Sequence, residues 1–136
     1  MQYLIVTIAF LTAGAVLGWM MFQEWGSSGS VTPEQVVDLL KSDSSVVILD
    51  VRTEAEYQSE TGYLKNATLI PVQELSGRLG ELEPFKGRTV VVYCRTDNRS
   101  RLATALLKEA GHDTLFMVGG VVRWNREGLP VERFDR

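Results

Sequence analysis

The residue with the clearest capacity for chemistry is Cys94, the single cysteine of the chain. It ends a β-branched run and precedes a short polar loop that leads into a predicted helix. A free cysteine is often an inert, buried apolar side chain. The nucleophilic form of cysteine, however, is the thiolate, which the amino end of a helix and nearby guanidinium groups stabilise. We therefore interpret Cys94 as a reactive thiolate.

The loop after Cys94 supplies the parts of such an environment. Its backbone N–H groups and the positive end of the following helix dipole converge near the sulfur. Asp97 opposes thiolate formation unless its carboxylate points outward or pairs with an arginine. Asp97 and Asn98 also suit the left-handed backbone of a tight turn. The loop residues are Arg95, Thr96, Asp97, Asn98, Arg99 and Ser100, and Arg101 adds a further cation.

The elements that must position this loop alternate between strands and helices. Apolar runs typical of strands buried on both faces occur at 46–51, 67–70, 89–94 and 114–118. A helix is predicted after the capping residue Thr32, and others at 54–59, 73–82, 100–110 and 121–127. The alternation predicts an α/β fold with an open, mostly parallel sheet of about four to five strands and helices on both faces. Ligands bind such sheets at the carboxyl ends of the strands, where Cys94 lies.

The amino-terminal part of the chain has a different composition. Residues 3–22 carry no charge, and a helix of that length spans a bilayer. We expect residues 1–25 to form one transmembrane anchor, residues 26–30 a Gly/Ser linker and residues 31–136 the soluble domain. The chain is therefore predicted to be a single-pass membrane protein.

Gly14 and Gly18 have the spacing at which two membrane helices approach closely, which allows a homodimer through this pair. No Lys or Arg precedes Lys41, so the positive-inside rule does not orient the anchor. We expect the domain to face the cytoplasm, where reductants regenerate a lone thiol.

Composition and charge argue against several other classes of function. The net charge is −3 and no long basic run occurs, so we expect no nucleic-acid partner. One cysteine permits no intramolecular disulfide and no cysteine-rich metal site. We expect neither a metal nor a cofactor.

Three motifs follow one another along the domain: Leu49-Asp50-Val51-Arg52 with Glu56-Tyr57, the loop from Cys94 to Ser100, and Gly119-Gly120-Val121-Val122-Arg123-Trp124. Together they resemble the single-domain rhodaneses, a family of sulfurtransferases, over roughly residues 31–131. The resemblance implies a rhodanese-like fold in which Cys94 carries sulfur as a persulfide. It also implies that the loop amides cradle this persulfide and that Arg95 and Arg99 steer an anionic donor.

The resemblance implies roles for residues outside the loop. Asp50 and Arg52 are expected to form a mainly structural pair at a strand end, with Arg52 holding the next segment through Glu56. Trp124 is expected to be a core anchor. His112 is placed on a surface turn and is not assigned a catalytic role.

Two departures from the family pattern leave the donor open. Residues 63–67 read Tyr-Leu-Lys-Asn-Ala where many relatives have His-Ile-Pro-Gly-Ala, and Asp97 replaces a common glycine.

The implied reaction is a ping-pong sulfur transfer. The donor would be thiosulfate or a persulfide, and the acceptor cyanide or a thiol such as thioredoxin, glutathione or a protein thiol. One alternative is a non-catalytic, membrane-tethered sulfur-binding or redox-sensing module. Another is a phosphatase or arsenate reductase on the same fold. That chemistry needs an arginine six residues after the cysteine to clamp an oxyanion, where this chain has Ser100.

Overall fold

The computed structural model describes residues 29–135. The predicted anchor, the Gly14 and Gly18 pair and linker residues 26–28 lie outside the described residues. Between Gly29 and Asp135, none of the helices has the length and apolar character needed to cross a membrane.

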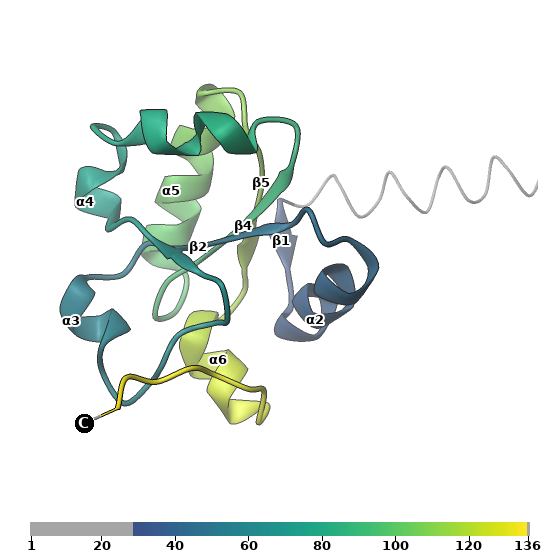
Figure 1. Ribbon diagram of the computed structural model, residues 1–136, viewed down its shortest axis with the longest axis vertical. Helices are drawn as coiled ribbons and strands as arrows, with labels where there is room; N and C mark the ends of the chain where they lie inside the picture. The colour runs from purple at the N-terminus through teal and green to yellow at the C-terminus, as the bar shows by residue number, and fades with distance from the viewer. Residues whose placement is uncertain (1–28, 136) are drawn as a thin grey trace, which may run out of the picture.

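A five-stranded, fully parallel sheet forms the centre of the domain (Figure 1). The strand order is β1-β5-β4-β2-β3. The predicted parallel α/β sheet is therefore confirmed, and its fifth strand is β1, which begins one residue before the predicted start of the domain. The strands are β1 (Ser30–Val31), β2 (Val47–Asp50), β3 (Thr68–Leu69), β4 (Thr89–Tyr93) and β5 (Asp113–Met117).

Helices cover both faces of the sheet, as expected. Side chains alternate between the two faces of β4, so Val90 and Val92 pack in one core and Val91 and Tyr93 in the other. The first core is closed by α4 (Val72–Leu75), the 3-10 helix η1 (Leu79–Phe85) and α5 (Asn98–Glu109). The second is closed by α2 (Pro33–Ser42) and α6 (Gly120–Arg126). The short helix α3 (Glu54–Tyr57) follows β2.

The single helix predicted at 73–82 is wrong, because the chain forms α4 and then η1. The amides of Gly77 and Arg78 bond to carbonyls three residues earlier, which closes turns in place of a continuing α-helix. Gly77 and Gly80 interrupt the segment, and glycine is a poor helix former.

The predicted surface position of His112 is also wrong, because His112 is only 5% exposed. α5 ends in a Schellman motif, in which Gly111 has φ +90° and the amide of His112 donates to the carbonyl of Leu107. The residue after the glycine in this motif commonly packs back onto the helix. His112 is therefore buried between α5 and the start of β5.

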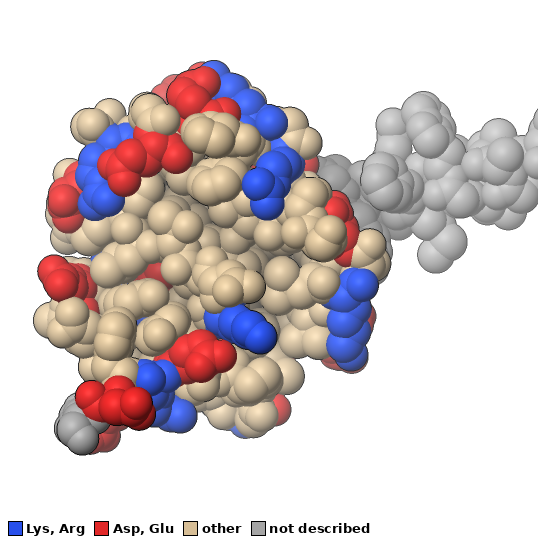
Figure 2. Space-filling view, viewed as in Figure 1, with Lys and Arg blue, Asp and Glu red and all other residues tan. Residues whose placement is uncertain are grey.

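Charged side chains of both signs are interspersed on the face shown in Figure 2. Several form short pairs along one element, such as Arg78 with Glu81 and Arg123 with Glu127. Such exposed pairs contribute little to stability.

Candidate active site

Cys94 follows β4 at the carboxyl edge of the sheet, the edge at which the parallel strands end. Its side chain is almost fully buried in the core beneath α5. Its Sγ lies 3.5 Å from the Oγ of Ser100, and that hydroxyl donates to the carbonyl oxygen of Asp97 at 2.9 Å. Residues 94–100, here termed the Cys94 loop, therefore curl around the sulfur before and during the first turn of α5.

The start of α6 binds the carbonyl groups of the Cys94 loop. The amide of Val121 donates to the carbonyl of Cys94 at 3.0 Å, and that of Val122 donates to Arg95 at 3.2 Å. Gly120 makes this approach feasible, because a Cβ at position 120 would overlap the Cys94 carbonyl and lie 2.5 Å from that of Arg95. The loop amides from Arg95 to Ser100 have no acceptor among residues 29–135, so they are available to an anion at the sulfur.

Asp97 turns its carboxylate toward α6. Its Oδ1 accepts from the amide of Gly119 at 2.8 Å, and it pairs with no arginine in the described part of the chain. Its backbone has φ −133°, and Asn66 is the one non-glycine residue between positions 29 and 135 with a left-handed backbone. The proposed left-handed turn at Asp97-Asn98 is therefore wrong. Asp97 joins the Cys94 loop to the Gly-Gly segment instead.

Arg99 is held by Glu56 from α3. The guanidinium and the carboxylate form two parallel hydrogen bonds of 2.6 and 2.7 Å. The hydrogen bonds from Arg99 are the main cause that lowers the pKa of Glu56 to about 2, against an ordinary value of 4.5. The same pairing, with a smaller contribution from the charge of Cys94, raises the pKa of Arg99. Arg99 therefore lies close enough to interact electrostatically with the sulfur, but the positive charge of Arg99 is already balanced by the carboxylate of Glu56.

Asp50 and Arg52 form a buried ion pair behind the loop. Arg52 Nη2 lies 2.7 Å from Asp50 Oδ2, and both side chains are at most 1% exposed. Burial disfavours the charge on Arg52, but the hydrogen bond and charge of Asp50 outweigh it and raise the pKa of Arg52. Arg52 also donates to Thr61 Oγ1 and to the backbone carbonyls of Glu56 and Gly62. It does hold the next segment, but through the backbone of Glu56.

The two other arginines of this region differ in their surroundings. Arg95 is exposed and has no carboxylate partner among residues 29–135. The guanidinium of Arg101 lies 4.9 Å from the centroid of the Phe116 ring. Arg95 is thus the loop cation that remains open to a ligand.

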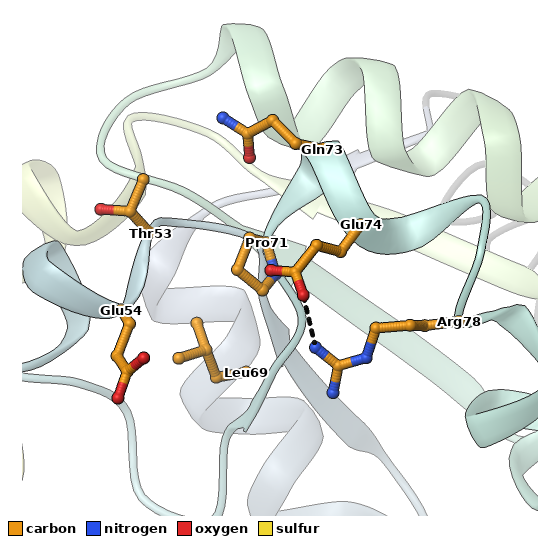
Figure 3. A pocket seen from close by; sticks show the side chains of 7 residues that line it. All are labelled: Thr53, Glu54, Leu69, Pro71, Gln73, Glu74 and Arg78. Atoms are coloured by element: carbon orange, nitrogen blue, oxygen red, sulfur yellow. Dashed lines mark hydrogen bonds and ion pairs between the residues drawn. The ribbon is translucent and has the colours of Figure 1, made fainter.

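A cavity of about 480 Å³ opens at the same edge of the sheet, where β2 and β3 end (Figure 3). Thr53 lines this cavity, and its Oγ1 donates to the carboxylate of Glu56. The cavity is therefore close to Glu56, but no residue of the Cys94 loop is among the residues that line it. Arg78, its one lining arginine, is bonded to Glu74 and to Glu81.

His112 precedes β5 and so lies at the amino edge of the sheet, opposite Cys94. Its two ring nitrogens are buried and have no hydrogen-bond partner among the described residues. No cluster of three or more histidine, cysteine, aspartate or glutamate side chains in residues 29–135 is arranged to hold a metal ion.

Trp124 is buried in the core between the sheet and α6, and its Nε1 donates to the carbonyl of Pro130. This position fits the expected core anchor.

Sequence reasoning missed the contact between Glu56 and Arg99 and the close approach of Gly120 to Cys94. Glu56 and Gly120 each belong to one of the three motifs found in the sequence. Glu56 follows Thr53 at the spacing of a capping box, which the structure contains. That spacing was the available signal that Glu56 turns back toward the strand end.

The chain belongs to the rhodanese-like domain family, whose sequence profile matches residues 32–127. A sulfurtransferase from Allochromatium vinosum is 33% identical over 74% of this chain and 92% of that protein. Among solved structures, a rhodanese-like domain protein from Staphylococcus aureus is 30% identical with a TM-score of 0.65, covering 76% of this chain and 97% of that one.

A thiosulfate sulfurtransferase from Pseudomonas aeruginosa is 31% identical with a TM-score of 0.68. The match covers 78% of this chain but 20% of that protein, so this chain corresponds to one part of it. These relatives support sulfur transfer as the general class of activity.

Proposed function

We propose that this chain is a sulfurtransferase that carries sulfane sulfur on Cys94. The observation that supports this most strongly is that amides of α6 bind the carbonyl groups of Cys94 and Arg95. With those carbonyls held away, the loop amides and the amino end of α5 can stabilise negative charge on a thiolate or a persulfide.

The reaction has two displacement steps. The Cys94 thiolate attacks the outer sulfur of the donor, a new S–S bond forms, and the donor leaves with the electron pair of the broken bond. Thiosulfate would leave as sulfite, and an organic persulfide would leave as a thiolate. A cyanide or thiol acceptor then attacks the terminal sulfur of the Cys94 persulfide and regenerates the thiolate.

The loop residues have distinct roles in this proposal. Ser100 Oγ accepts a hydrogen bond from the Cys94 thiol while its own hydroxyl donates to the carbonyl of Asp97, so Ser100 positions the sulfur. Arg95 attracts an anionic donor, and the amides of Thr96 and Asn98 contribute to the persulfide cradle. Thioredoxin, glutathione or a protein thiol would be the acceptor in the cell.

Steady-state assays test this function and separate it from a non-catalytic sulfur-binding or redox-sensing module. The full chain is supplied with thiosulfate or glutathione persulfide and an excess of cyanide, glutathione or reduced thioredoxin. We expect many turnovers per chain, and none for Cys94→Ser. Loading of Cys94 without turnover to any acceptor would instead identify a binding or sensing module.

A phosphatase or arsenate reductase is less well supported. Position 100 carries a serine hydroxyl, and the guanidinium of Arg99 is bonded to Glu56. A guanidinium engaged in this way does not clamp a tetrahedral oxyanion. Turnover of an aryl phosphate would revive this alternative.

We also propose, from the uncharged run at residues 3–22, that the chain is anchored in a membrane with its domain in the cytoplasm. Tags at the two ends and their access to added protease would test this orientation.

A further inference from the structure

The Cys94 loop has less net positive charge than its arginines alone would give. Arg95 and Arg99 are positive, whereas Asp97 lies in the same loop and Glu56 is bonded to Arg99. The guanidinium groups of Arg95 and Arg99 are thus balanced by two carboxylates, whereas the guanidinium of Arg101, in the first turn of α5, lies over the Phe116 ring. The neighbouring cavity does not restore a positive field, because its arginine, Arg78, is paired with Glu74 and Glu81.

Glu56 is firmly fixed in this arrangement. Its Oε2 accepts hydrogen bonds from Arg99 and from both the amide and the hydroxyl of Thr53, and its Oε1 accepts from Arg99. Both terminal nitrogens of Arg99 already donate to this carboxylate. Arg99 therefore cannot present the same pair of donors to an incoming anion without losing Glu56.

The low net charge of the Cys94 loop affects the reactions of the two classes of sulfur donor differently. Attack of a thiolate on thiosulfate brings together a monoanion and a dianion, and sulfite carries the two charges away. Attack on a protonated organic persulfide, R–S–SH, involves one negative charge at the reacting sulfurs, which leaves as R–S⁻ while Cys94 becomes Cys–S–SH. Glutathione persulfide in this form, with two carboxylates and one ammonium group, still has a smaller net charge than thiosulfate. The first reaction needs local cations to offset repulsion between like charges much more than the second does.

We propose that Glu56 and Asp97 are specificity-determining residues that make an organic persulfide a better donor than thiosulfate. This inference rests on the proposed sulfurtransferase function and specifies its donor class.

The first test compares two donors on the full chain. Loading of Cys94 by thiosulfate and by glutathione persulfide is followed by quenched intact-mass measurement, and the same two donors are reacted with free cysteine. The ratio of persulfide to thiosulfate rates for the protein is then divided by the same ratio for free cysteine, which removes the intrinsic reactivity of the donors. We expect the protein to favour the persulfide beyond this reference, and a protein that favours thiosulfate beyond it would overturn the inference.

The second test removes the two carboxylates one at a time. Glu56→Gln and Asp97→Asn should each raise the ratio of thiosulfate to persulfide loading rates about tenfold, with a steeper decline of the thiosulfate rate in salt. Asp97→Asn keeps an oxygen acceptor for the Gly119 amide, so it tests charge with little change in the loop. Glu127→Gln, which removes the partner of Arg123 on α6, is the matched control and should leave the ratio unchanged.

The outcomes distinguish this inference from the function on which it rests. Loading of Cys94 by both donors with the same ratio in the parent, Glu56→Gln and Asp97→Asn would disprove charge-based selection and leave sulfur transfer intact. Failure of both donors to load Cys94 in the parent would remove the proposed function itself.

Discussion

Arg52 and Arg99 both bind carboxylates at the carboxyl edge of the sheet, but they differ in burial. The side chain of Arg52 is 1% exposed and that of Arg99 is 29% exposed. An ion pair removed from water depends on both partners, because loss of one leaves the other charge buried and unpaired. Loss of one partner of the Arg52–Asp50 pair should therefore destabilise the fold, whereas the pair of Arg99 and Glu56 adjusts a folded site.

We predict that Arg52→Ala lowers the free energy of unfolding by about 3–5 kcal/mol, because it strands the carboxylate of Asp50 in the core. Urea denaturation followed by circular dichroism measures this change. Arg126→Ala, at the exposed end of α6, is the control and should cost less than about 0.5 kcal/mol. Equal effects of the two substitutions would contradict a structural role for Arg52.

Glu56 gives a prediction about pH, since its pKa is lowered from 4.5 to about 2 in the folded chain. A carboxyl group with a lowered pKa stabilises the fold above its unfolded pKa and loses that contribution as the pH falls toward the folded value. Parent and Glu56→Gln should thus differ by about 1–2 kcal/mol at pH 7. The difference should shrink between about pH 5 and pH 2. Urea midpoints across this range provide the measurement, and a difference independent of pH would show that the Glu56 charge is not involved.

Among the elements, the amino end of α6 fixes the conformation of the Cys94 loop, although α6 lies about twenty residues further along the chain. Gly120 allows this contact because it has φ +56° and lies against the carbonyls of Cys94 and Arg95. Gly128 also has a left-handed backbone, with φ +71°, but no atom lies within 4 Å of its Cβ position. Comparing alanine substitutions at the two glycines therefore distinguishes the cost of backbone strain, which both share, from the cost of close packing, which arises only at Gly120.

We predict that Gly120→Ala destabilises the chain by about 1–3 kcal/mol more than Gly128→Ala does, through steric overlap with the loop. It should also slow sulfur transfer by about tenfold or more, because a shift of the loop displaces the reacting sulfur. Gly128→Ala should incur only the cost of left-handed backbone. Equal transfer rates in the two variants would mean that α6 does not position the loop.

Local sequence signals predicted much of this element arrangement. The apolar runs at β2, β4 and β5 predicted strands, and the capping residue Thr32 marked the start of α2. The expected burial on both faces is found in β2 and β4 but not in β5, of which only Thr114 and Met117 are buried. Local signals could not predict β1, which has two residues and is defined only by pairing with β5. The partner of Arg99 was equally hidden, because Glu56 lies 43 residues away and only the fold brings the two together.

At the scale of the whole molecule, strand direction relates the site to the start of the domain. β1 runs parallel to the other strands, so the chain enters the sheet at the amino edge, and Cys94 lies at the opposite edge. The four residues 26–29, between the proposed anchor and the start of β1, span at most about 14 Å. If residues 1–25 form the proposed anchor, the amino edge faces the bilayer and the Cys94 loop faces away from it toward soluble donors and acceptors.

We predict that the full chain sediments with membranes and resists extraction by alkaline carbonate, because residues 3–22 form an uncharged segment of membrane-spanning length. A chain that starts at residue 26 should remain in the soluble fraction and retain sulfur transfer. Recovery of the full chain in the soluble fraction would contradict the anchor.

The most direct test of sulfur transfer through Cys94 is the intact mass of the chain after exposure to a sulfur donor. Incubation with thiosulfate or glutathione persulfide, followed by removal of the donor, should add the mass of one sulfur atom. The adduct should disappear on treatment with cyanide or a thiol, and Cys94→Ser should not acquire it. Absence of a one-sulfur adduct with both donors, or its persistence in Cys94→Ser, would contradict the claim that Cys94 carries sulfur.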